Sequence, residues 1–198
     1  MSTAAHTSLY LVRHAESRFI EGRERERGLT EQGYLDAEKI AQQLYSEDMD
    51  VFYSSPYVRA VHTIQALADL SGKPVMTEED LRERALSGPH VQHEHFHVAK
   101  RQLYRDPSFA FPGGESGYQA QARAIHILQQ ILHKHSGEKI VIGTHGDVMT
   151  LILQHYDPAY GFEFWESTTM PDIYRMDLDT GNHMLQITRL WNEAEQEV

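Results

Sequence analysis

The sequence feature that most constrains the fold is an alternation of short apolar runs with longer amphipathic segments. Three continuous apolar runs have the length of buried strands, and they are residues 9–12, 51–53 and 140–142. The segments between them place apolar side chains at the spacing of a helix packed on one face, and they are residues 37–44, 60–68 and 124–131. Strands that alternate with helices predict an α/β fold, in which a mostly parallel sheet carries helices on both faces as a three-layer α/β/α sandwich.

Two parts of the chain depart from this alternation. Residues 173–178 and 184–190 flank a polar turn, which predicts a C-terminal hairpin. Residues 80–117 are interrupted by prolines and glycines and lack a clear amphipathic period, which predicts a lid-like insertion. A chain of 198 residues is long enough for one sizeable core, so we expect a single domain over residues 1–198.

Composition narrows the chemistry that such a fold can support. The chain has no cysteine, which excludes disulfides, thiolate nucleophiles and cysteine-ligated zinc. Its formal net charge of -11 argues against general affinity for nucleic acid or acidic membrane surfaces. The N-terminal residues are small and polar and the apolar run after them is short, so we expect a soluble, cytoplasmic protein. The oligomeric state stays open, a homodimer included.

Polar side chains stand where three of the predicted strands give way to the next helix. They are Arg13 and His14, Ser55 and Arg59, and His145. In a parallel sheet these junctions share one edge, which is where α/β proteins bind ligands. Two guanidinium groups, two imidazoles and the free N–H groups of helix N-termini suit a phosphate better than a monovalent carboxylate. We therefore predict a phosphate site at this edge.

Four motifs resemble, in their order, those of a known enzyme superfamily. Residues 11–17, Leu-Val-Arg-His-Ala-Glu-Ser, resemble the Arg-His-Gly signature that opens the histidine phosphatase (phosphoglycerate-mutase-like) superfamily. Residues 28–33 look like its Leu-Thr-x-x-Gly segment, and residues 54–63 look like its second phosphate-binding element. Residues 144–146, Thr-His-Gly, look like its Ser-His-Gly. The order of these motifs makes the resemblance specific, and it covers residues 9–155.

The phosphatase branch of this superfamily has one further matching segment. Residues 112–116, Pro-Gly-Gly-Glu-Ser, look like its Gly-Glu-Ser segment when they are taken together with Arg123. The resemblance therefore implies the phosphatase branch.

The resemblance implies a role for each matching residue. His14 matches the nucleophile that carries the phosphoryl group, and His145 matches the second histidine at the transferred group. Arg13 and Arg59 match the phosphate-binding arginines, which also disfavour a second positive charge on the nucleophile. Glu83 matches the proton donor for the leaving oxygen. The alternatives for that carboxyl lie just upstream and are Glu78, Glu79 and Asp80.

The chain departs from the family at one phosphate contact. Many members have an asparagine six residues beyond the nucleophile, where this chain has Ile20. Ser17 and Arg23 are the candidate substrate-binding residues that could replace it. The rest of the alternating charges up to Arg27 are interpreted as a solvated loop or helix face, not a binding patch.

A metal centre is the weaker interpretation of a histidine-rich stretch. Its members are His90, His93, His95 and His97, and their spacing matches no compact structural zinc site. We expect solvated or substrate-contacting histidines there, and neither a metal nor another cofactor.

The sequence thus predicts a metal-independent phosphatase that hydrolyses small phosphorylated metabolites through a phosphohistidine on His14. One alternative is a phosphoglycerate mutase that uses the same intermediate. A second is a catalytically silent protein that binds phosphorylated ligands, since a fold alone does not guarantee turnover.

Overall fold

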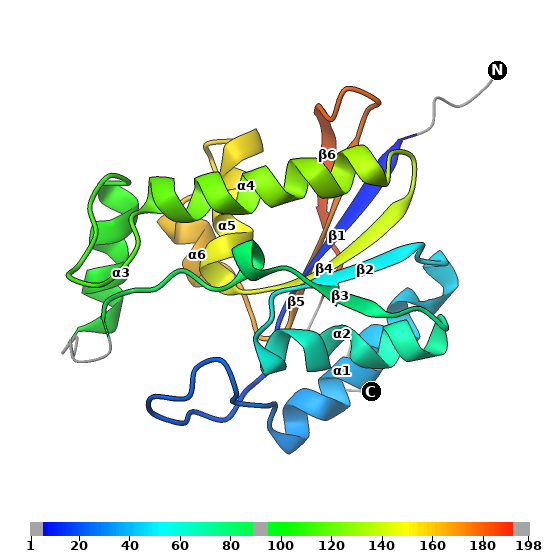
Figure 1. The fold of residues 1–198 in the computed structure, drawn as a ribbon, viewed down its shortest axis with the longest axis horizontal. Coiled ribbons are helices and arrows are strands. Elements are labelled where there is room, and N and C mark those ends of the chain that lie inside the picture. The colour runs from blue at the N-terminus through cyan, green and yellow to red at the C-terminus, as the bar shows by residue number, and fades with distance from the viewer. Residues whose placement is uncertain (1–5, 89–94, 192–198) are drawn as a thin grey trace.

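The computed structural model describes residues 6–88 and 95–191, and one six-stranded sheet forms its centre (Figure 1). The strands are β1 (Thr7–Arg13), β2 (Val51–Ser54), β3 (Val75–Thr77), β4 (Lys139–Thr144), β5 (Asp172–Leu178) and β6 (Met184–Arg189). Their order across the sheet is β3-β2-β4-β1-β5-β6. The first four strands in this order are parallel, whereas β5 is antiparallel to β1 and β6 is antiparallel to β5. The mostly parallel sheet and the C-terminal hairpin are therefore confirmed.

The strand register places the three predicted strand-to-helix junctions side by side at one end of the parallel strands. Arg13 at the end of β1 pairs with Thr144 of β4, and Ser54 at the end of β2 pairs with Gly143 of β4. The residue after β1, His14, still donates its backbone N–H to the Thr144 carbonyl at 2.9 Å. Residues far apart in the sequence therefore meet at one edge of the sheet.

Two helical layers cover the sheet, as the sequence predicts. The helices α1 (Glu31–Leu44) and α2 (Val58–Leu70) pack on one face, and α4 (Gly117–Lys134) and α5 (Gly146–Tyr156) pack on the other (Figure 1). Along β1, Leu9 and Leu11 belong to the core beneath α4 and α5, whereas Tyr10 and Val12 belong to the core beneath α1 and α2. Both faces of β1 are buried, which explains its continuous apolar run.

Side-chain caps fix the starts of two helices. The Thr30 hydroxyl accepts a hydrogen bond from the Gly33 N–H at 3.0 Å, at the start of α1. Ser116 and Gln119 form a reciprocal capping box at the start of α4. Both helices therefore begin upstream of the apolar segments at residues 37–44 and 124–131 that predicted them.

Two helices were not predicted from the sequence. The segment 80–117, expected to lack a helical period, contains α3 (Phe96–Arg105), and α6 (Phe162–Ser167) follows α5. The inner face of α3 buries Lys100 beside Ala99 and Leu103, so a charged residue interrupts its apolar pattern. The aromatic residues of α6 pack against α3, with the Tyr104 and Phe162 rings 6.0 Å apart.

Short 3-10 turns, η1 (Tyr45–Glu47) and η2 (Glu79–Leu81), complete the described secondary structure. Within the two described stretches, no helix combines the length and the apolar composition needed to span a membrane.

Candidate active site

His14 stands directly after β1 with only 5% of its surface exposed. Its Nδ1 lies 2.8 Å from the backbone oxygen of Ala15. Because a carbonyl oxygen can only accept, Nδ1 carries the proton and Nε2 keeps its lone pair. Burial, followed by the charge of Arg59, lowers the pKa of His14 well below its usual 6.5. The structure therefore holds a neutral imidazole whose Nε2 can act as a nucleophile.

The loop after His14 is fixed from two helices. The Ala15 N–H donates to the Thr63 hydroxyl of α2 at 3.0 Å. The Glu16 carbonyl accepts from the Thr30 N–H at 3.0 Å, and a Cβ on Gly33 would come within 2.2 Å of that same oxygen. The segment at residues 28–33 therefore needs a glycine, because α1 begins against the backbone of the nucleophile loop.

Arg13 supplies the first guanidinium at this edge. Its Nη1 donates to the backbone oxygen of Thr168 at 3.0 Å and also contacts the hydroxyl of Thr168. A Cβ on Gly146 would lie 3.1 Å from the Arg13 guanidinium carbon, so the glycine of the Thr-His-Gly motif leaves room for this arginine. Burial lowers the pKa of Arg13 below its usual value, and the guanidinium remains a cation.

Arg59 supplies the second guanidinium from the first turn of α2, and 2% of its surface is exposed. It lies over the Tyr57 ring at 4.9 Å and donates to the Glu24 carbonyl at 2.5 Å. Burial and the charge of Arg27 lower the pKa of Arg59 to about 10. A buried cation of this kind is strongly attracted to an incoming anion, because little water screens it.

His145 lies at the start of α5 and is fully buried. Its ring centroid is 5.3 Å from that of His14, and its Nε2 lies 2.7 Å from the Ser55 hydroxyl. Burial, then the charge of Arg59, lowers the pKa of His145 well below 6.5. Its Nδ1 is buried and has no hydrogen-bond partner in the described parts of the chain, so it can still bond a ligand.

Glu83 reaches the same place from the loop after η2. Its carboxyl oxygens accept from the backbone N–H groups of Arg84 at 2.9 Å, Val148 at 3.3 Å and Asp147 at 3.4 Å. Burial, followed by the charge of Asp147, raises the pKa of Glu83 above its usual 4.5. The carboxyl group can therefore hold a proton at the start of α5, where its charge acts on Arg13 and Arg59. The upstream alternatives Glu79 and Asp80 instead pair with arginines, Arg25 and Arg82.

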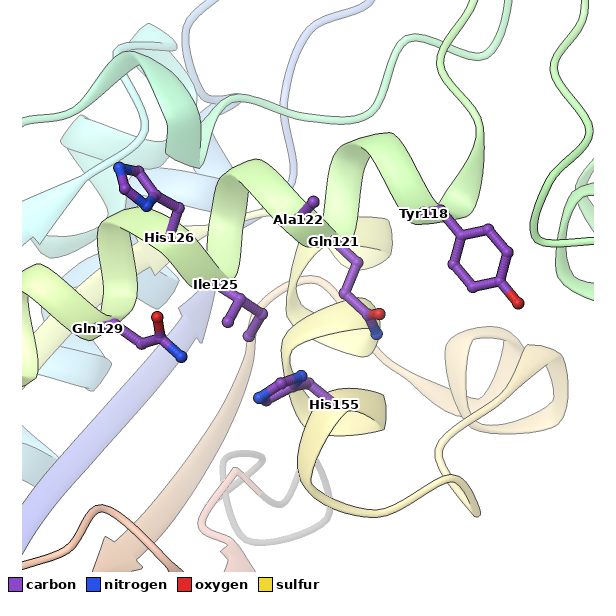
Figure 2. Close-up of a pocket in the computed structure, with 7 residues that line it drawn as sticks. All are labelled: Tyr118, Gln121, Ala122, Ile125, His126, Gln129 and His155. Carbon is purple, nitrogen blue, oxygen red and sulfur yellow. The ribbon is translucent and has the colours of Figure 1, made fainter.

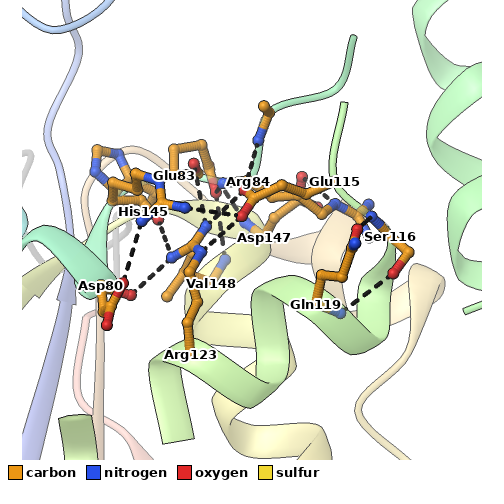
Figure 3. A network of polar contacts seen from close by, with 12 residues as sticks. Asp80, Glu83, Arg84, Glu115, Ser116, Gln119, Arg123, His145, Asp147 and Val148 are labelled. Carbon is orange, nitrogen blue, oxygen red and sulfur yellow. Dashed lines mark hydrogen bonds and ion pairs between the residues drawn. The ribbon is translucent and has the colours of Figure 1, made fainter. Parts of the chain in front are cut away.

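A buried polar network surrounds Glu83 (Figure 3). Asp147 is paired with Lys100, accepts from the Tyr104 hydroxyl at 2.8 Å and lies 3.4 Å from Arg84. Although burial opposes ionisation, the charges of Lys100 and Arg84 hold the pKa of Asp147 below its usual 3.8. Lys100 and Tyr104 belong to α3, so this network ties the inserted helix to the start of α5.

The segment that carries Glu83 is held by Arg123 of α4 (Figure 3). Its guanidinium donates to the backbone oxygens of Asp80 at 2.7 Å, Arg82 at 2.9 Å and Glu83 at 3.4 Å. It also forms two 2.8 Å hydrogen bonds to the Glu115 carboxylate. The segment that resembles the phosphatase branch thus fixes the backbone of the candidate acid.

The two candidates for replacing the missing asparagine differ in their location. Ser17 accepts a hydrogen bond from Arg27 at 2.5 Å. Arg23 pairs with Glu26 and leaves 62% of its side chain exposed, so it does not reach the site. Arg27 is 15% exposed, and its charge acts on both histidines and on Arg59. The expectation of a solvated loop is therefore wrong for Arg27, whose one sequence clue is its place directly before the motif at residues 28–33.

The histidine-rich stretch is only partly described. His90 and His93 lie outside the described residues, whereas His97 lies 3.5 Å from Glu166 at the surface. Residues 6–88 and 95–191 contain no group of three or more potential metal-ligating side chains. A hollow between α4 and α5, lined by residues such as Gln121 and His155, contains none of the candidate site residues (Figure 2).

Known proteins are similar over most of the chain. Residues 9–192 match the histidine phosphatase superfamily (branch 1). Phosphoglycerate mutase-like protein 4 of Arabidopsis thaliana is 32% identical over 78% of this chain and 73% of its own length. Putative phosphoserine phosphatase 2 of Hydrogenobacter thermophilus is 28% identical over 73% of this chain and 76% of its own length. The solved structure of mycobacterial glucosyl-3-phosphoglycerate phosphatase shares the fold with a TM-score of 0.75 at 18% identity, covering 94% of this chain and 99% of that one.

Proposed function

Because the chain belongs to the histidine phosphatase superfamily, we propose that it hydrolyses small phosphomonoesters through a phosphohistidine on His14. One observation carries this proposal, namely a buried neutral His14 whose Nδ1 donates to a carbonyl, so that Nε2 keeps its lone pair beside two guanidinium groups. A protein that only bound phosphate would not need an unprotonated nucleophile there. This argues against a silent phospholigand-binding protein.

In the first step, His14 Nε2 attacks phosphorus and the bond from phosphorus to the leaving oxygen breaks. Glu83 gives its proton to that oxygen, so the first product leaves as an alcohol. Arg13 and Arg59 donate to the phosphoryl oxygens, whose charge they balance as the bond breaks. His145 hydrogen-bonds the same group through Nδ1. The arginines supply the positive charge that metal ions supply in other phosphatases.

In the second step, water attacks the phosphohistidine and gives a proton to the Glu83 carboxylate. The bond between phosphorus and Nε2 breaks, inorganic phosphate leaves, and both residues return to their starting protonation states. The same carboxyl thus serves as acid and then as base, and a pKa raised above 4.5 keeps its acid form available at higher pH than for a free carboxyl.

A phosphoglycerate mutase is the second candidate, because one relative is named as phosphoglycerate mutase-like. It would return the phosphoryl group to the bound product instead of to water. The Gly-Glu-Ser segment bonded to Arg123 supports the phosphatase. We further propose a small phosphorylated metabolite as substrate and a cytoplasmic location, in keeping with the net charge and the absence of cysteine.

Rapid quench under alkaline conditions tests the intermediate, because phosphohistidine is acid-labile. With p-nitrophenyl phosphate, the wild-type protein should carry one phosphate on His14, found by mass spectrometry. His14→Ala should lose both the adduct and turnover. His126→Ala, at an exposed histidine on α4, is the matched control and should keep both. Turnover that persists in His14→Ala would exclude this mechanism.

A further inference from the structure

The loop between the nucleophile and α1 delivers an arginine that the mechanism above does not use. Ser17 and Leu29 form an isolated antiparallel bridge, and the Arg18 N–H donates to the Gly28 carbonyl at 3.1 Å. These contacts close the loop at its base. Arg27 lies at that base, one residue from Gly28, whereas Arg23 lies farther along the loop.

The contacts of Arg27 place its guanidinium next to that of Arg59. Arg27 Nε donates to Glu24 Oε2 at 3.0 Å, and Arg59 Nη2 lies 3.5 Å from the same oxygen. Arg59 is one of the arginines assigned to the phosphoryl group. Two cations that share one carboxylate oxygen form a site for an anion. The side chain of Glu24 is 49% exposed and belongs to an irregular loop, so an incoming dianion can compete with it.

The missing asparagine leaves a role for this arginine. Ile20 carries no hydrogen-bond donor, so it cannot contact a phosphoryl oxygen. Arg27 presents five N–H groups, of which Nε serves Glu24 and one on Nη1 serves Ser17. At 15% side-chain exposure it is far less hydrated than Arg23, and its charge already acts on His14 and His145.

We propose that Arg27 is a third phosphate-binding arginine, which together with Arg13 and Arg59 holds the phosphoryl group and takes the place of the contact missing at Ile20. The inference rests on the proposed function, since it concerns the same site. It assigns to Arg27 the role that the sequence had suggested for Ser17 or Arg23.

Binding of inorganic phosphate and of orthovanadate, measured by calorimetry, tests this assignment without requiring turnover. Arg27→Gln should weaken both about tenfold to a hundredfold, as expected for the loss of a charge-assisted hydrogen bond. Arg27→Lys keeps the charge and should recover part of that loss. Arg23→Gln is the matched control, with the same change in the same loop, and should stay within about twofold of wild type.

Arg27→Lys also separates binding from a structural role. Lysine keeps the charge of Arg27 but lacks the guanidinium fork that contacts both Glu24 and Ser17. If Arg27→Lys recovered none of the affinity that Arg27→Gln loses, Arg27 would act only by holding the loop and the inference would be wrong. It would also be wrong if Arg27→Gln bound phosphate like wild type while Arg59→Gln lost affinity. Unchanged affinity in Arg59→Gln as well would instead overturn the proposed phosphate site.

Discussion

His14 and Glu83 illustrate how single residues set the chemistry of this site. The same burial lowers the pKa of the imidazole and raises the pKa of the carboxyl, because a low-dielectric surrounding disfavours the charged form of each. The charge of Arg59 adds to the shift of His14, and the charge of Asp147 adds to that of Glu83, against Lys100 and Arg59. Both shifts favour the neutral form of the group.

This arrangement predicts the pH dependence of kcat/KM. Below the pKa of His14 the nucleophile is protonated, so activity should fall on the acid side only well below pH 6.5. Above the pKa of Glu83 the acid is ionised, so activity should fall on the alkaline side at a pH above 4.5. Initial rates measured across pH should give this acid-shifted bell. An acid limb at pH 6.5 or higher would show that His14 is not held neutral.

Glu83→Gln should separate substrates by their leaving groups. A phenolate such as that of p-nitrophenyl phosphate needs little protonation, so the variant should lose at most about tenfold in kcat on it. An alkyl phosphate needs the proton, and its kcat should fall by about 100-fold or more. Glu79→Gln, at an exposed carboxylate beside Arg25, is the control and should change neither rate. Equal losses on both substrates would point to a structural role for Glu83.

Among the secondary-structure elements, α4 has a structural task beyond covering the sheet, because Arg123 binds the loop that carries Glu83. Arg123→Met removes a cation that is 10% exposed and leaves Glu115 partly buried without its main partner. We expect the free energy of unfolding to fall by about 2–4 kcal/mol. Arg25→Met breaks an ion pair with Glu79 that is 53% and 55% exposed, and should cost less than about 1 kcal/mol. Urea unfolding of both variants measures the difference, and equal losses would contradict this account.

The elements that the sequence predicted are those in which the spacing of apolar residues follows directly from the face that is buried. The runs at residues 9–12 and 140–142 are apolar because both faces of the sheet are covered, and the amphipathic segments at residues 37–44 and 124–131 lie in α1 and α4, which cover those faces. The helix α3 was missed because its inner face binds a buried carboxylate through Lys100. The buried face of α3 therefore carries a charged residue where an amphipathic helix usually has an apolar one.

The sequence predicted the candidate site residues that lie at the ends of regular strands, and it did not predict the one that lies in an irregular loop. Arg13, His14 and His145 follow directly from the ends of strands, and the register of the sheet brings them together. Arg27 could not be found in this way, because it lies in an irregular loop whose alternating charges are typical of solvated segments. Only the folded loop distinguishes the two arginines, because the side chain of Arg27 is 15% exposed and that of Arg23 is 62% exposed.

Over the whole molecule, the net charge of -11 means that phosphate is attracted locally and not by the general field of the protein. The buried arginines and the start of α5 concentrate positive potential at one sheet edge. Their burial makes this attraction resistant to screening by salt. Whether water or the first product then takes the phosphoryl group from the phosphohistidine depends on the residues that enclose the site.

A mutase must hold its first product, exclude water and let the product turn before it takes the phosphoryl group back. Here the chain after Glu83 has short side chains at Ala85 and Ser87, and Gly88 donates its N–H to the Pro112 carbonyl at 2.8 Å. This stretch is thus bonded to the segment that resembles the phosphatase branch. The one charged side chain in residues 84–88, Arg84, is buried and lies 3.4 Å from Asp147, so it is not placed to hold a carboxylate product.

We therefore expect water to reach the phosphohistidine faster than the product can take the phosphoryl group back. With 3-phosphoglycerate as substrate, inorganic phosphate should form, and a coupled assay for the 2-isomer should stay at background. A parallel reaction with p-nitrophenyl phosphate shows that the same preparation is active. Isomerisation without release of phosphate would make the protein a mutase. It would still leave His14 as the group that carries the phosphoryl, because both reactions pass through the same intermediate.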